Sequence, residues 1–129
     1  MQMYNGLSLD HVETIIKMEK ECLTGQGHTK EELCAYVRQR PGEQYMLFSE
    51  ETQEMACFCL TLRTQSIGHL KTLSMVRLRE EGNSTGPVLV IVALVSYRRG
   101  DLLLDAVLKE ASRLPGVRTV VAVSRCCFF

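Results

Sequence analysis

An uninterrupted apolar run, Val88 to Val95, constrains the fold of this chain more than any other feature of its 129 residues. Strands of a half-exposed sheet alternate apolar and polar residues, whereas strands that are covered on both faces are apolar throughout. The run is also far too short to span a bilayer. We therefore predict a strand that is buried on both faces of a sheet.

The segment after this run predicts a parallel connection. A turn, Ser96-Tyr97-Arg98-Arg99-Gly100-Asp101, leads into a helical pattern that ends at Leu114-Pro115-Gly116. A second apolar run, Val117 to Val123, follows directly. Strand, helix and strand in this order form a β–loop–α–β unit whose two strands are parallel.

The first half predicts helices followed by a hairpin. Thr29 and Glu32 have the spacing of a capping box, and Pro41-Gly42 is a stop signal for the helix that they begin. No linker or repeat divides the sequence, so residues 1–129 are predicted to form one α/β (α+β) domain with a mixed sheet. The expected elements are a strand at Met1–Tyr4, a helix from Ser8 or Asp10 to about Leu23, the capped helix, and an antiparallel hairpin of Tyr45–Phe48 with Met55–Arg63.

The formal net charge is zero, from 15 basic and 15 acidic side chains, and Trp is absent. These values argue against a basic or base-stacking nucleic-acid binder, so no nucleic-acid partner is expected. The overall neutrality conceals an asymmetry, because residues 1–64 have a formal net charge of −4 and residues 65–129 have a formal net charge of +4. An anionic ligand is therefore expected in the second half, unless the asymmetry is a chance drift of surface charge.

The six cysteines do not have the spacing of a metal site or a disulfide framework. Cys57 and Cys59 are expected on one face of a strand, because side chains alternate along a strand. The polar start of the chain does not resemble a signal peptide. These features predict a cytoplasmic protein with reduced thiols, no metal and no membrane association.

The turn between the buried strand and the second-half helix is the candidate functional site. Helix N-termini present free N–H groups to anions, and Arg98 and Arg99 add donors that suit phosphate. The alternative is a solvated basic turn in which Asp101 caps the helix.

The order of elements resembles the GNAT acetyltransferase superfamily, and Ala93-Leu-Val-Ser-Tyr-Arg-Arg-Gly100 looks like its central motif. Within that superfamily the layout is most similar to the arylalkylamine (serotonin) N-acetyltransferases. That narrower resemblance rests on Ile16-x-x-Glu19-x-x-Cys22, Thr72-Leu-Ser-Met75 and Val117-Arg118-x-Val-Val. The resemblance covers about Leu9 to Ser124.

The resemblance implies an acetyl-CoA-dependent N-acetyltransferase that acylates a small primary amine, with an arylalkylamine as the favoured acceptor. Main-chain groups of the strand would hold the pantetheine and the turn would hold the pyrophosphate. The loop around Leu73 to Arg79 would cover the amine. The implied acetyl-CoA-binding residues are Ala93, Leu94, Val95, Arg98, Arg99, Gly100, Asp101 and Leu102.

The resemblance leaves the catalytic residues unassigned. Leu102 stands where the family has a second small residue, no histidine follows His69, and Tyr97 is the last tyrosine. The chain is expected to lack the family's last helix and strands. A second hypothesis is therefore a non-catalytic acyl-CoA-binding or protein-interaction domain, with a homodimer or partner contact at the C-terminal sheet edge.

Five further side chains are candidates for the site or lie near it in the sequence. His28 is expected to be an ordinary surface histidine, and Tyr97 is expected to pack beneath the turn. His69 could shuttle protons if the long loop covers the acceptor. Ser124 and Cys126 could line a site at the end of the last strand, although packing at the chain end is the simpler interpretation.

Overall fold

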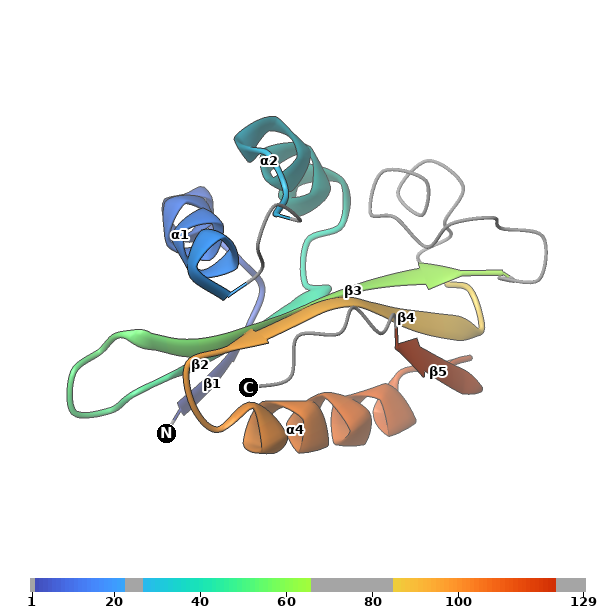
Figure 1. Ribbon diagram of the computed structural model, residues 1–129. Helices are drawn as coiled ribbons and strands as arrows, with labels where there is room; N and C mark the ends of the chain where they lie inside the picture. Colours follow the sequence, from blue (N-terminus) through green and yellow to red (C-terminus); the bar gives the residue numbers. More distant parts are fainter. Residues whose placement is uncertain (1, 23–26, 66–84, 123–129) are drawn as a thin grey trace.

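In the computed structural model the described residues are 2–22, 27–65 and 85–122, and they form one five-stranded sheet between two helical layers (Figure 1). Helices α1 and α2 cover one face, and α4 covers the other. The elements are β1 (Gln2–Asn5), a short 3-10 helix (Leu9–His11), α1 (Val12–Cys22), α2 (Lys30–Gln39), β2 (Gln44–Phe48), β3 (Met55–Thr64), β4 (Val88–Ser96), α4 (Gly100–Arg113) and β5 (Thr119–Ala122).

The strands lie in the order β1-β2-β3-β4-β5. Strands β1 to β4 are antiparallel to their neighbours, whereas β4 and β5 are parallel. The predicted mixed sheet, the hairpin of β2 and β3, and the β–loop–α–β unit are therefore confirmed. None of the helices in the described ranges is long and apolar enough to cross a membrane.

The two N-terminal helices begin differently. Thr29 caps α2: its hydroxyl accepts from the Glu32 N–H at 3.2 Å, and the Glu32 carboxylate accepts from the Thr29 N–H at 3.2 Å. The predicted capping box is confirmed. Ser8 precedes the short 3-10 helix, and its side chain makes no capping hydrogen bond.

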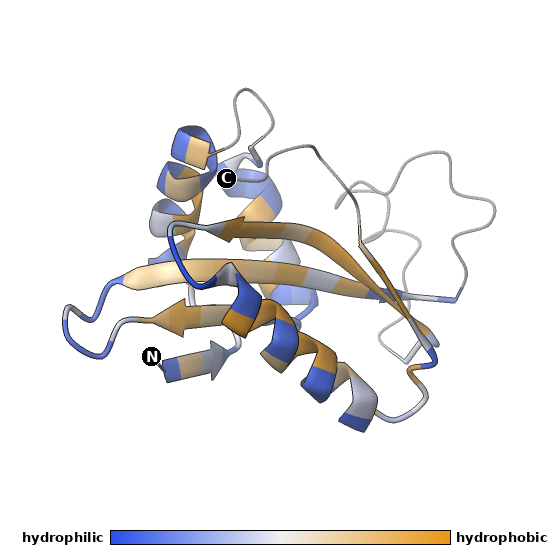
Figure 2. Cartoon of the chain, turned by 60° about the horizontal axis from the view of Figure 1, so that its bottom comes forward, coloured by the Kyte–Doolittle hydropathy of each residue, from blue (hydrophilic) through white to orange (hydrophobic). Residues whose placement is uncertain are grey.

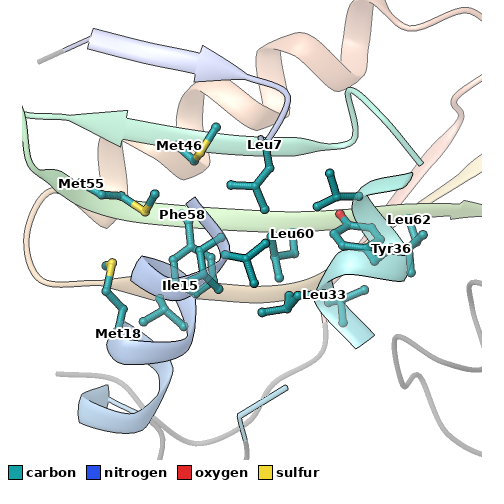
Figure 3. Packing of buried hydrophobic residues seen from close by; sticks show 14 of the residues in the cluster. Leu7, Ile15, Met18, Leu33, Tyr36, Met46, Met55, Phe58, Leu60 and Leu62 are labelled. Carbon is teal, nitrogen blue, oxygen red and sulfur yellow. The ribbon is translucent and has the colours of Figure 1, made fainter. Parts of the chain in front are cut away.

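The layer between the sheet and helices α1 and α2 holds the larger part of the core (Figure 3). Ile15 and Met18 from α1 and Leu33 and Tyr36 from α2 belong to one cluster over the sheet, and Figure 3 shows Ile15 between Met18 and Leu33. Phe58 of β3 is fully buried beneath them. This packing fixes both helices over β3 and β4, because each contributes one apolar stripe.

A second apolar layer lies between the sheet and α4. The central strands are mainly hydrophobic, whereas α4 alternates hydrophobic and hydrophilic residues (Figure 2). Cys57 and Cys59 are fully buried in this layer with Leu103 and Val107 of α4. The prediction that both thiols share one face of a strand is confirmed.

Burial in this second layer predicts inert thiols. Removal from water is the main cause that raises the pKa of Cys57 and of Cys59 from 9.0 to about 12. The thiolate is the species that iodoacetamide alkylates. At pH 8 we therefore expect both residues to be alkylated about a thousand times more slowly than in the urea-unfolded chain, as followed by peptide mass spectrometry. Equal rates in the folded and unfolded chains would contradict the buried placement.

Candidate functional site

A bulge in β4 changes which residues face each layer. Leu60 of β3 is opposite Ala93, and Thr61 is opposite Ile91, so Val92 is an extra residue on β4. Val92 and Ala93 consequently both contact the layer of α1 and α2. Bulges of this kind redirect the strand that carries them, and they are common beside functional sites.

Beyond the bulge, β4 extends past its described pairing with β5. Ladder pairs with β5 end at Ile91 and Ala122, whereas pairs with β3 continue to Ser96. Within the described ranges, the main chain of residues 93–95 therefore has no ladder partner on its β5 side. Alternate N–H and C=O groups of a strand point to that side, and a strand edge without a ladder partner can pair with an extended ligand.

The side chains of this segment are only partly covered. Val95 is buried, Ala93 is half-buried, and Leu94 is 36% exposed. The prediction that the strand is buried on both faces holds for its first half and is wrong at its carboxyl end. The physical reason is that Leu94 is not among the described residues that pack with α4 in the second apolar layer.

The turn after β4 is held against β3. The N–H groups of Tyr97 and Arg98 both donate to the Ala56 carbonyl, at 2.9 and 3.4 Å. Arg99 then adopts the left-handed conformation, with φ 60° and ψ 34°, and is the N-cap residue of α4. The expectation that Asp101 caps this helix is wrong, because Asp101 already lies in the first helical turn.

Gly100 allows α4 to start close to β4. A Cβ atom at this position would lie 3.0 Å from Ser96 Cβ and 3.1 Å from Ser96 Oγ. Both distances are shorter than ordinary van der Waals contacts. Glycine therefore fits this close approach, whereas a Cβ atom would make Ser96 or the first turn of α4 shift by a few tenths of an ångström. The approach places the first N–H groups of α4 beside the carboxyl end of β4.

The charges at the turn are mixed. Arg98 and Arg99 are exposed, and Arg99 Nε lies 3.3 Å from Asp101 Oδ1. The pKa of the Asp101 carboxyl is lowered, first by its hydrogen bond with Arg99 and further by the N–H groups of Leu102 and Asp101. The carboxylate thus uses the donors that an external anion would use at this helix N-terminus.

The side chain of Tyr97 lies on the side of the sheet that α1 covers, opposite α4. Its side chain is 49% exposed and its hydroxyl donates to Glu21 Oε2 near the end of α1. The expectation that Tyr97 packs beneath the turn is wrong, since the strand alternation after the bulge directs it toward α1. Burial and the Glu21 carboxylate raise the pKa of Tyr97 to about 12, which keeps the phenol protonated.

His28 lies in a buried pair with Glu19 of α1. The side chains are 8% and 0% exposed, and His28 Nδ1 is 2.7 Å from Glu19 Oε2. The His28 N–H also donates to Glu19 Oε1 at 3.1 Å. The expectation of an ordinary surface histidine is therefore wrong. A signal was present in the sequence, because Glu19 follows Ile15 by four residues and so belongs to the buried face of α1.

The structure brings together all eight residues expected to bind acetyl-CoA, at the end of β4 and the start of α4. His69, the segment Leu73–Arg79, Ser124 and Cys126 lie outside the described residues. Across residues 2–22, 27–65 and 85–122, no group of three His, Cys, Asp or Glu side chains is arranged to hold a metal ion.

Comparisons with protein-family profiles and with curated protein sequences find no match. Solved structures do match. The GNAT-like decarboxylase GphF in complex with isobutyryl-CoA aligns with a TM-score of 0.84 at 22% identity, over 98% of this chain and 67% of that chain. The loading GNATL domain of CurA from Lyngbya majuscula gives 0.84 at 20% identity, over 97% of this chain and 65% of that one.

An acetyltransferase of known structure matches less closely. The aminoglycoside 6'-N-acetyltransferase AAC(6')-Ih from Acinetobacter baumannii aligns with a TM-score of 0.62 at 13% identity, over 97% of this chain and 81% of that chain. This chain spans about two thirds of the length of the GphF and CurA structures. At these identities the similarity establishes architecture, and the chain has the α+β GNAT fold.

Proposed function

We propose that this chain binds an acyl-CoA thioester at the carboxyl end of β4 and transfers its acyl group to a primary amine. The observation that carries the proposal is the segment of β4 after the Val92 bulge. It has no ladder partner in the described part of β5, and it leads into a helix N-terminus with two arginines. This combination offers both an amide edge and an anion site.

The two halves of CoA differ in chemistry, and so do the two halves of this site. Pantetheine contains amide groups that pair with an open strand edge, here the main chain of Ala93, Leu94 and Val95. The pyrophosphate is anionic and suits Arg98, Arg99 and the N–H groups from Gly100 to Leu102. The thioester would then lie beside the bulge.

Acyl transfer at this place needs no resident cofactor beyond the thioester. The amine nitrogen attacks the thioester carbonyl, a C–N bond forms, and the C–S bond breaks as the thiolate leaves. A free N–H on the open edge of β4 would stabilise the oxyanion that develops. An arylalkylamine is the acceptor suggested by the resemblance of the sequence.

Decarboxylation is a second candidate for the same site. The GNAT-like decarboxylase GphF aligns with a TM-score of 0.84, compared with 0.62 for the aminoglycoside acetyltransferase. In that reaction a 2-carboxyacyl-CoA would lose CO₂ and its α-carbon would gain a proton. The pantetheine and pyrophosphate contacts proposed above serve either reaction.

Thermal unfolding with added CoA esters tests the binding proposal. A ligand that binds only the folded state raises the Tm. We expect acetyl-CoA or malonyl-CoA to raise it, and no rise at millimolar concentration of either would reject acyl-CoA binding. Release of CoA thiol with 2-phenylethylamine would support acyl transfer. Conversion of malonyl-CoA to acetyl-CoA would support decarboxylation, and binding without either reaction would favour a non-catalytic domain.

The ion pair between Asp101 and Arg99 predicts that a conservative substitution of Asp101 strengthens the binding of acetyl-CoA. Asp101→Asn removes the charge that occupies Arg99, and it leaves a side chain of nearly equal size. Because exposed ion pairs are weak, we expect acetyl-CoA to bind about two- to fivefold more tightly at low salt. The gain should shrink at high salt, where charges are screened. Isothermal titration measures it, with Asp105→Asn, which lies in the second turn of the same helix, as the matched control. Weaker binding by Asp101→Asn would contradict this role.

A further inference from the structure

The buried Glu19–His28 pair is not used by the contacts proposed for CoA. Glu19 is fully buried on α1, and its two carboxylate oxygens receive two different groups of one residue, the N–H and the Nδ1 of His28. The backbone bond alone would fasten the chain before α2. The additional bond to Nδ1 fixes the imidazole ring itself.

These contacts select one tautomer of the neutral ring. A carboxylate only accepts hydrogen bonds, so a neutral His28 paired with it carries its hydrogen on Nδ1. Nε2 then carries the lone pair, and no hydrogen bond engages Nε2 within the described ranges. Gly27 permits this arrangement, because even a Cβ atom there would lie 3.3 Å from Glu19 Cβ.

The pair belongs to the part of α1 that lies near the carboxyl end of β4. Met18 and Cys22, which flank Glu19 on α1, belong to the apolar layer between the helices and the sheet, which also holds Ala93 and Val95. Glu21 accepts a hydrogen bond from Tyr97, just beyond the end of β4. The C-terminal half of α1 thus covers the face of β4 that lies opposite α4.

We propose that His28, positioned by Glu19, is the proton-accepting residue of this site. The inference rests on the proposed acyl transfer and deepens it. His28 Nε2 takes a proton from the attacking amine as the C–N bond forms. It returns that proton to the CoA sulfur as the C–S bond breaks, so that the products are an amide and the free thiol. Glu19 holds the ring through its hydrogen bond with Nδ1 and is therefore a positioning residue.

A first experiment needs no acceptor. The chain has three histidines, so ¹⁵N-histidine labelling gives a simple spectrum in which His28→Asn identifies the signals of His28. At about pH 8.5, where an ordinary imidazole is neutral, we expect the Nδ1–H tautomer in the wild type and its partial loss in Glu19→Gln. Saturation with acetyl-CoA should shift the Nε2 signal of His28 and leave those of His11 unchanged.

The outcomes distinguish the role of His28 from the binding of acyl-CoA itself. If acetyl-CoA raises the Tm and His28 Nε2 does not shift, the inference is overturned and acyl-CoA binding stands. If neither acetyl-CoA nor malonyl-CoA raises the Tm, the proposed function itself fails. A shift at Nε2 together with a raised Tm supports both.

A second experiment distinguishes catalysis from structure. The side-chain amide of asparagine can replace Nδ1–H as donor to Glu19, but it has no basic nitrogen in place of Nε2. We expect His28→Asn to lower kcat with 2-phenylethylamine by about 10²–10⁴-fold at unchanged KM for acetyl-CoA. Added imidazole should restore part of the rate in His28→Ala, and His11→Gln should behave as wild type. Wild-type turnover by folded His28→Asn would reject the role.

Discussion

Replacing Gly100 by valine is expected to abolish the thermal stabilisation by acetyl-CoA at concentrations that saturate the wild type. The new side chain would enter space that Ser96 occupies, where even a Cβ atom is 3.0 Å from its nearest neighbour. The first turn of α4 must then move away from β4. That movement separates the helix N-terminus from the open strand edge, and overpacking of this kind also costs about 1–3 kcal/mol in stability.

A paired substitution shows whether contact with Ser96 is the cause. Gly100→Ala adds only the Cβ atom, and Ser96→Gly removes both atoms that it would meet. We expect Gly100→Ala to lower the Tm and the affinity for acetyl-CoA, and the double variant to recover most of both. An affinity that stays low in the double variant, despite a restored Tm, would show that the explanation by contact is wrong.

Phe58→Ala is expected to produce the largest loss of stability, about 3–5 kcal/mol, measured by urea unfolding. Phe58 is 0% exposed at the centre of β3, beneath both helices of the larger core layer. Truncation removes apolar contacts to α1 and α2 and leaves a cavity between rigid layers. A loss of this size is comparable with the whole stability of a small domain, so the variant is expected to be largely unfolded at 37 °C.

Leu108→Ala provides the matched comparison, because Leu108 lies on α4 and is 44% exposed. We expect it to change the free energy of unfolding by about 0.5 kcal/mol or less. Similar losses for both variants would mean that the core does not lie where the structure places it.

Local sequence patterns predicted the fold well, because most elements depend on local rules. The capping box at Thr29 sets the start of α2, and the apolar run gives β4 with an error of one residue. The last strand was expected from Val117, but its ladder with β4 begins at Thr119. Parallel pairing depends on where α4 returns the chain to the sheet, and no residue pattern in the strand itself encodes that position.

The candidate site was predicted in outline and missed in its details. The structure places the turn at Arg98 to Asp101 between β4 and α4, as expected, and its role in binding an anion stays a prediction that rests on the chemistry of helix N-termini. The Glu19–His28 pair and the Tyr97–Glu21 hydrogen bond join residues that are separated by as many as 76 positions. Such contacts arise when the helical layers pack on the sheet. In the sequence, the local indication of the first pair was the position of Glu19 on the apolar face of α1.

The odd residue in β4 also has a consequence for how this chain tolerates insertions and deletions. Side chains alternate with a period of two, so one added residue reverses the phase of everything after it. Loss of Val92 would remove this odd residue and leave Ala93, Leu94 and Val95 opposite Leu60, Cys59 and Phe58, on the faces that they occupy now. Loss of one residue elsewhere in β4 would instead exchange the two faces of the strand on one side of the deletion. The bulge is therefore the place in β4 where a one-residue deletion changes the facing of the strand least.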